Sequence, residues 1–130
     1  MIAPALTTII TGNTTINTAI QGRFRPVSDL AEGLPAIYYI VRAVFNYNKT
    51  GQHMQTWRVT MLVMHNEYKA GWQLALKVKE AMEAKERQTV SGILMQRVEC
   101  QQIADEYEFP VESYVHSIDF EIVTQTILTN

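Results

Sequence analysis

The sequence predicts an α+β fold, with a mainly antiparallel sheet of four to five strands and one long helix packed on one face. Short N-terminal helices and a long protruding β-hairpin complete the expected architecture. Long segments in which apolar and polar residues alternate predict strands, and consecutive strands are connected as hairpins. One long segment with the apolar spacing of a helix separates the two pairs of strands. With 130 residues and no internal repeat, the chain is expected to form one domain, residues 1–130.

Two short helices are expected at the start of the chain. Residues 3–11 form a helix candidate in which Pro4 is tolerated in the first turn, and Gly12 is a natural end. Asn13 then offers an N-cap for a second helix over residues 14–21, although threonines are weak helix formers. We therefore expect a helix pair separated by a tight turn.

The segment that follows is expected to lie at a sheet edge. Residues 23–27 are typical of a short edge strand, because Pro26 cannot donate a backbone hydrogen bond to a neighbouring strand. Gly33 and Pro35 interrupt residues 28–35, which are expected to form a loop or a single turn.

Residues 34–66 are expected to form a long hairpin with its turn at residues 48–51. The first strand is largely apolar on both faces until Arg42, which is typical of a strand covered on both sides. The second strand alternates. One of its faces carries Trp57, Val59, Met61 and Val63, and the other carries Arg58 and Thr60.

The hairpin is longer than the expected body of the domain. Strands of about 13 residues at roughly 3.3 Å per residue extend roughly 43 Å. A compact domain of this size has a diameter of roughly 36 Å. The tip is therefore expected to project as an interface arm, with a twisted hairpin that curls over its own helix as the alternative. The arm comprises Asn46, Tyr47, Asn48, Lys49, Thr50, Gly51, Gln52, His53 and Met54.

A strong amphipathic helix is predicted from residue 67 to about residue 87, with Asn66 as its N-cap. Its exposed face offers two ion pairs at i,i+4 spacing, Lys79–Glu83 and Glu83–Arg87. Its apolar positions are Tyr68, Gly71, Trp72, Ala75, Val78 and Met82.

Two further strands are predicted after the break at Ser91-Gly92. The first covers residues 93–103, with Leu94, Val98 and Cys100 as its inner residues. A polar connection at residues 105–110 leads to the last strand, residues 113–126. One face of that strand carries Tyr114, Ile118, Phe120 and Ile122, and the other carries Ser117, Asp119 and Glu121.

The composition excludes several classes of protein. The net charge of −2, the pI of about 5.9 and the absence of a basic stripe argue against an electrostatic nucleic-acid binder. Charged residues make up only 18%, which favours a protein that buries surface against copies of itself or partners. One cysteine, no basic N-terminal region and no long apolar run indicate a reduced environment, no secretory signal and no membrane span.

Candidate catalytic and metal-binding residues are few. His53, His65 and His116 have no metal-ligand spacing, and the proximity of His65 to Glu67 is common by chance. Cys100 occupies an inward position of an apolar strand, which is typical of a structural cysteine rather than a nucleophile. The sequence therefore predicts no catalytic residue, no cofactor, no metal and no enzyme activity.

Two weaker patterns each have an ordinary structural interpretation. The carboxylates Asp105, Glu106 and Glu108 are expected in a solvated turn, with a paired acid–base site as the alternative. Arg23 and Arg25 flank Phe24, which is a faint base-stacking pattern. Charges that protect a sheet edge are the favoured interpretation.

Five segments together carry a resemblance to a known family. They are "GRFRPV" (22–27), "LPAIYYIVR" (34–42), "WRVTMLVMHNEYKAGWQLALKVKEAM" (57–82), an acidic "DEYEF" and "ESYVHSIDFEIVTQT" (112–126). These segments resemble the tail completion or tail terminator proteins of long-tailed bacteriophages and prophages, including the minor tail proteins of lambda-like phages. The resemblance covers most of the chain in the pattern and spacing of its elements, without catalytic signatures. The short, threonine-rich first helix departs from the family pattern.

The resemblance implies a structural virion protein that assembles in the host cytoplasm and lies at the head-proximal end of the tail. Such proteins form a ring, commonly a homo-hexamer, which ends the tail tube and joins it to the head–tail connector. DNA passes through the ring without specific binding, and no membrane is involved. The projecting hairpin is then expected to contact the neighbouring subunit or the tube.

Two other functions are compatible with the sequence. The first is a head-closure or neck protein of the connector, which is also a ring of small α+β subunits. The second is a small dimeric α+β barrel enzyme, whose pocket would need convergent polar groups such as His116, Tyr114 and Tyr39.

Overall fold

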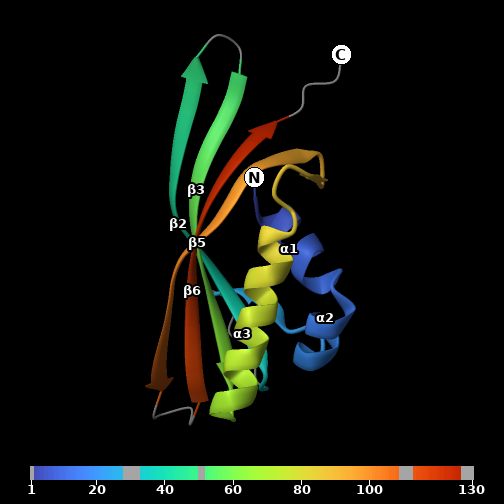
Figure 1. Cartoon of the computed structure of the whole chain (residues 1–130), viewed down its shortest axis with the longest axis vertical. Coiled ribbons are helices and arrows are strands. Elements are labelled where there is room, and N and C mark those ends of the chain that lie inside the picture. The colour runs from blue at the N-terminus through green and yellow to red at the C-terminus, as the bar shows by residue number, and fades with distance from the viewer. Residues whose placement is uncertain (1, 28–32, 50–51, 109–112, 127–130) are drawn as a thin grey trace.

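The computed structural model describes residues 2–27, 33–49, 52–108 and 113–126. Figure 1 shows a tall curled sheet with all the described helices beside it. The elements are α1 (Ala3–Thr11), α2 (Thr14–Ile20), β1 (Phe24–Pro26), β2 (Ala36–Lys49), β3 (Gln52–His65), α3 (Tyr68–Glu83), β4 (Thr89–Val90), β5 (Ile93–Glu108) and β6 (Ser113–Thr126).

The sheet has six strands in the order β1-β2-β3-β6-β5-β4. The four long strands pair antiparallel, and only β1 pairs parallel, with β2. This confirms the predicted α+β class. The two-residue strand β4 adds one strand to the four or five expected, because the chain after α3 turns back onto the start of β5.

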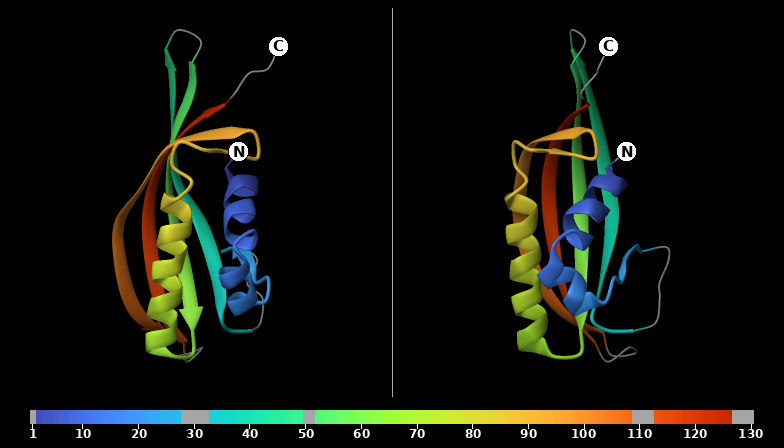
Figure 2. Two further views of the ribbon diagram at one scale, coloured as in Figure 1. Left: turned by 45° about the vertical axis from the view of Figure 1, so that its right-hand side comes forward. Right: turned by 90° about the vertical axis from the view of Figure 1, so that its right-hand side faces the viewer.

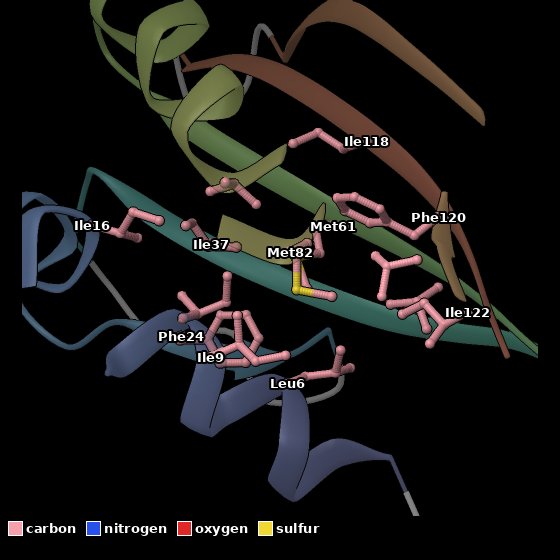
Figure 3. Packing of buried hydrophobic residues seen from close by; sticks show 14 of the residues in the cluster. Leu6, Ile9, Ile16, Phe24, Ile37, Met61, Met82, Ile118, Phe120 and Ile122 are labelled. Atoms are coloured by element: carbon pink, nitrogen blue, oxygen red, sulfur yellow. The ribbon is translucent and has the colours of Figure 1, made fainter. Parts of the chain in front are cut away.

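The three helices cover one face of the sheet (Figure 2). Between these layers lies a continuous core, seen in Figure 3, to which every helix contributes. The alternation predicted for β3 and β6 is confirmed, because the inner residues of both strands are buried. These residues are Trp57, Val59, Met61, Val63, Ile118, Phe120 and Ile122. No helix in the described part of the chain is long and apolar enough to cross a membrane.

The N-terminal helices form as predicted. The Asn13 side chain accepts a hydrogen bond from the Ile16 N–H at 3.1 Å and so caps α2. Gln21 ends α2 in a left-handed conformation with a φ of 52°. The hydroxyls of Thr8 and Thr11 donate to carbonyls one turn earlier in α1, so these threonines satisfy their polar groups locally.

The start of α3 corrects two expectations. The N-cap is Glu67 rather than Asn66, and the Nδ1 atom of His65 accepts the Glu67 N–H at 2.9 Å. Tyr68 is 48% exposed, whereas Leu74, which the predicted apolar face omitted, is buried. The helix face that meets the sheet is therefore rotated slightly towards Leu74.

The end of α3 lies earlier than predicted. The helix ends at Glu83 rather than near residue 87, and Arg87 has a φ of 67°. The Lys79–Glu83 ion pair is present at 2.7 Å. Because the chain has left the helix by Arg87, the predicted Glu83–Arg87 pair lacks its helical spacing.

Two β-bulges in β5 alter the predicted facing of its residues. The register with β6 shifts between Met95 and Arg97 and again between Cys100 and Gln102. Each extra residue reverses which face the following side chains occupy. Met95 lies before the first bulge and Val98 after it, so both residues are buried although they are three positions apart. The prediction that Leu94 is an inner residue is therefore wrong. Val98 is buried as predicted, and the half-buried Cys100 packs against the core as predicted.

The polar connection predicted at residues 105–110 is wrong for most of its length. β5 continues to Glu108 and pairs with β6 as far as Glu108↔Ser113. Backbone pairing with β6 outweighs the low strand propensity of the acidic residues. Asp105, Glu106 and Glu108 thus lie in a strand, and residues 109–112 lie outside the described residues.

Candidate assembly interface

The β2–β3 hairpin extends beyond the rest of the sheet. β3 last pairs with β6 at Met54↔Gln125, whereas β2 and β3 remain paired as far as Lys49↔Gln52. The resulting two-stranded arm points away from α1 and α3 (Figure 1). The alternative of a hairpin that curls over its own helix is therefore wrong.

The predicted arm residues lie on both strands of this projection. Asn46, Tyr47, Asn48 and Lys49 end β2, and Gln52, His53 and Met54 begin β3. Thr50 and Gly51 lie outside the described residues. The function of these residues as an interface stays a prediction.

The outer edge of β2 is covered at one end only. β1 pairs with residues Ile37 to Tyr39, the Ile37 N–H donates to the Arg23 carbonyl at 2.9 Å, and the Val27 N–H donates to the Tyr39 carbonyl at 3.0 Å. Beyond Tyr39, no described strand pairs with this side of β2. Residues 40–49 therefore form an open edge, which is a template for another strand.

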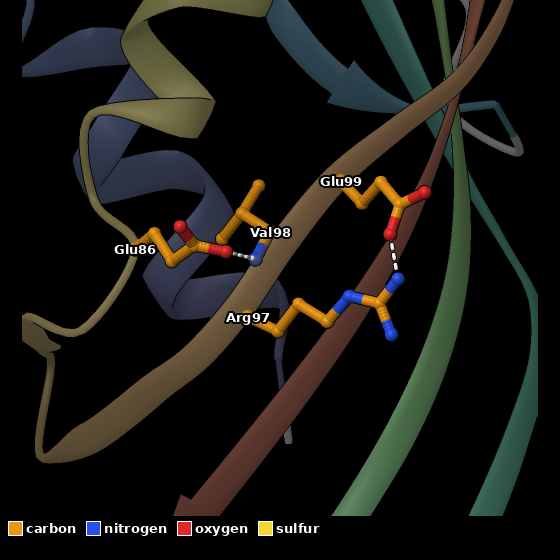
Figure 4. A network of polar contacts seen from close by, with 4 residues as sticks. All are labelled: Glu86, Arg97, Val98 and Glu99. Carbon is orange, nitrogen blue, oxygen red and sulfur yellow. Dashed lines mark hydrogen bonds and ion pairs between the residues drawn. The ribbon is translucent and has the colours of Figure 1, made fainter.

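The outer edge of β5 is covered at its start. β4 pairs with Ile93 and Leu94, and the Met95 N–H donates to the Gln88 carbonyl at 2.8 Å. The Glu86 carboxylate then accepts the Val98 N–H at 3.3 Å (Figure 4). Beyond Val98 the described residues provide no further strand, so residues 99–108 form a second open edge.

Polar side chains gather on the sheet face opposite the helices. The Arg42 Nε donates to the Thr60 Oγ1 at 3.0 Å, and the Thr60 hydroxyl donates to the Asp119 Oδ1 at 2.6 Å. Thr60 is buried and joins three strands through these bonds. The three residues border a cleft of about 580 Å³, which Arg58, Gln101, Ser117 and Glu121 also line.

Positive and negative charges are matched on this face. Arg97 and Glu99 form an ion pair (Figure 4), and Arg58 lies directly opposite Glu121 in the register of β3 and β6. With Arg42 and Asp119, the arginines on this face are balanced by carboxylates. Such a face has little net attraction for a polyanion.

Of the residues proposed for an enzyme pocket, His116 and Tyr114 both pack against Tyr68, whereas Tyr39 lies elsewhere. His116 is fully buried, and its ring lies against Tyr68 and Trp72 at centroid distances of 5.3 and 5.6 Å. Tyr39 instead stacks on Phe24 at 5.0 Å, and the sheet register places His116 opposite Val63. None of the proposed enzyme residues lines the 580 Å³ cleft. The three side chains thus do not form together the pocket that the barrel-enzyme alternative requires.

His116 is an unusual buried histidine. Neither ring nitrogen has a hydrogen-bond partner among the described residues, and burial lowers the pKa of the imidazole. The negative charge of Asp105 opposes this shift. The Asp105 carboxylate accepts a hydrogen bond from the Tyr68 hydroxyl at 2.8 Å. That hydrogen bond also raises the pKa of Tyr68. The arrangement favours a neutral His116 in the folded state.

The remaining candidate residues have structural contacts. His65 and Glu67 are joined through the helix cap, and no metal-binding cluster occurs in the described part of the chain. Burial raises the pKa of the half-buried Cys100 thiol, which disfavours a thiolate nucleophile. The Arg23 Nε donates to the Pro35 carbonyl at 2.9 Å, so this side chain ties the sheet edge to the following segment.

The sequence matches no protein-family model and no curated protein. The structure, in contrast, is similar to a chain in the virion of a native gene transfer agent (GTA) particle. The TM-score is 0.75 at 7% sequence identity, and the match covers 93% of this chain and 92% of that chain. A likeness at this identity shows that the two chains share a fold.

Glu86 is the residue at the edge of β5 that sequence reasoning missed. In the sequence it reads as one more exposed residue of the long helix, but the helix ends at Glu83 and the chain then brings Glu86 to β5. Only the strand pairing shows that the Val98 N–H needs a partner. The polar group around Thr60, in contrast, follows from the predicted outward positions of Thr60 and Asp119.

Proposed function

We propose that this protein is a structural virion protein of a phage-like particle and acts as a tail terminator. In this proposal it forms a ring, a homo-hexamer, which caps the head-proximal end of the tail tube and joins it to the head connector. The observation that carries the proposal is the fold likeness to a GTA virion chain, which extends over nearly all of both chains.

The shape of the subunit supports assembly into a ring. Ring subunits use heterologous contacts, in which two different surfaces of the same chain meet. This chain offers a projecting arm at one end of the sheet and open edges on both sides of it. The arm then reaches the neighbouring subunit or the tail tube.

The charge of the subunit supports the passage of DNA. Phosphate contacts from unpaired lysines and arginines would hold DNA in place. The net charge is −2, and the arginines on the helix-free face lie beside carboxylates. We propose that this face borders the hole, through which DNA moves without specific binding.

The test uses tail tubes assembled in the absence of their terminator. The purified protein is added to growing tubes, and electron microscopy measures tube length and the position of the bound protein. A terminator is expected to bind one end and to stop growth. Binding to filled heads instead of tubes would indicate the head-closure role, and tubes that continue to grow with no bound protein would contradict the proposal.

A further inference from the structure

We propose that neighbouring copies of this chain join by strand pairing, with residues 41–48 of β2 antiparallel to residues 100–107 of β5 in the next copy. The inference rests on the proposed ring. It adds the surface that forms the ring contact, namely two open strand edges of one sheet. We refer to this contact as the β2–β5 seam.

Strand direction favours this pairing. The order β2-β3-β6-β5 is antiparallel at every step, so β2 and β5 run in opposite directions. Rotation about a ring axis along the sheet preserves the direction of each strand. The β2 edge of one copy therefore meets the β5 edge of the next as an antiparallel pair, which needs no rearrangement of either strand.

The backbone groups of the two edges are matched in number. The N–H of Ile37 points to the outer edge of β2, and the N–H of Val98 points to the outer edge of β5. Along each strand, every second residue points its backbone N–H to the outer edge, and this alternation shifts by one residue at the bulges after Val41 and Cys100. The residues with outward N–H groups follow from this rule. They are 41, 44, 46 and 48 on β2 and 100, 103, 105 and 107 on β5.

The covered parts of the edges lie at diagonal corners of the sheet. β1 covers the start of β2, whereas β4 and Glu86 cover the start of β5. Because the strands run in opposite directions, these starts lie at opposite ends of the sheet (Figure 1). Val41 and Cys100 lie at the same level of the sheet, because Val41 pairs with Val59, Val59 with Phe120 and Phe120 with Cys100. The seam therefore requires neighbouring copies to be offset along the strands by about six residue steps, roughly 20 Å. Sheets that close edge to edge into one barrel tilt their strands by roughly 35–45°, and such a tilt offsets neighbouring copies. In the proposed ring, this offset places the open part of β2 beside the open part of β5.

Val41 provides a specific test of the seam. It is 37% exposed, and proline at this outward position removes an edge N–H without removing a bond of the sheet. The matched control Val41→Ala shortens the same side chain and keeps the N–H. The full-length variants are compared by light scattering across a concentration series and by thermal unfolding. We expect Val41→Pro to weaken assembly more than ten-fold and Val41→Ala to leave it within two-fold.

Amide hydrogen exchange provides a readout that does not depend on a variant. Exchange of the unaltered protein is compared between dilute subunits and assembled rings, with residue resolution. We expect slower exchange at the outward amides of both 41–48 and 100–107, by at least ten-fold.

The outcomes separate this inference from the proposed function. Rings that form without new protection in either segment overturn the seam and leave the ring intact. Protection of residues 41–48 alone would indicate two copies joined β2 to β2, which also overturns the seam. Failure to assemble at any concentration or on tail tubes would overturn both proposals.

Discussion

The carboxylate of Glu86 accepts a hydrogen bond from the backbone N–H of Val98 at 3.3 Å, and this contact marks the boundary between the covered and open parts of β5. An unpaired strand edge invites the addition of another strand, and a charged side chain is a common means of protection. Glu86 therefore limits the length of the β5 edge that is open in the subunit.

Replacing Glu86 is expected to expose more of the edge. Glu86→Ala leaves the Val98 N–H without its partner, and we expect the free energy of unfolding to fall by about 1 kcal/mol. The longer edge is also expected to promote larger, less uniform assemblies. Urea unfolding and light scattering measure the two effects. Glu80→Ala, which removes the same charge from α3, is the control and should change neither quantity.

The hydrogen bond between Trp57 and Thr124 is expected to contribute to stability across β3 and β6. The Trp57 Nε1–H donates to the buried Thr124 Oγ1 at 2.8 Å. Trp57→Phe leaves the Thr124 hydroxyl unpaired, so we expect a loss of about 1–3 kcal/mol. In a double-mutant cycle with Thr124→Val, the double variant should lose about 1 kcal/mol less stability than the sum of the two single losses. Strictly additive losses would show that the bond contributes nothing.

Gly71 is expected to be required for the close approach of α3 to β6. A Cβ at this position would lie 2.9 Å from the His65 Cβ and 3.0 Å from the His116 ring. Alanine usually stabilises a helix interior relative to glycine. Here Gly71→Ala is expected to reduce stability by about 1–3 kcal/mol through overpacking. Thermal unfolding measures the effect, and the exposed position Gln73→Ala should stay within about 0.5 kcal/mol.

Stability is expected to depend on pH through His116. Because its folded-state pKa lies below the unfolded value of 6.5, the unfolded chain binds more protons between the two values. Stability should therefore be fully present above about pH 6.5 and fall as the pH drops below it. Urea unfolding from about pH 5 to pH 8 measures this slope.

The slope at low pH can be assigned with two variants. The groups that face His116 are Asp105 and Tyr68, and His65 lies on β3 beside them. His116→Phe removes the titrating group and should flatten the slope below pH 6.5. His65→Gln should retain it. A slope that persists in His116→Phe would assign the pH dependence to another group.

The arm is expected to function in assembly rather than in folding. Between Met54 and the tip of the arm, β3 pairs only with β2. Deletion of residues 49–53 therefore removes no residue pair between β3 and β6. We expect the unfolding midpoint to change little and assembly to weaken. Circular dichroism checks the fold, and light scattering checks the mass. Unchanged assembly would exclude the arm from the ring contact.

The core face could be predicted from the sequence wherever alternation is unbroken. Val59, Met61 and Val63 on β3 and Ile118 and Phe120 on β6 are buried as expected. These strands lie inside the sheet, where one face meets the helices and the other does not. Because successive side chains of a strand point to opposite faces, every second residue of these strands faces the core and is apolar.

Features that depend on distant partners could not be predicted in this way. The bulge between Met95 and Arg97 keeps β5 in register with β6, and residues 93–97 contain no glycine that would mark it in the sequence. The acidic end of β5 is a strand because β6 supplies hydrogen bonds as far as Ser113. The projection of the hairpin followed from its length, but the open edges required the strand order.

The mass of the assembled protein tests the central claim most directly. Light scattering across a concentration series, alone and with tail tubes, distinguishes a closed ring from other states. The ring proposal predicts a hexamer, reached either by concentration or on the tube end. A stable dimer at every concentration, or a monomer that neither assembles nor binds tubes, would contradict it.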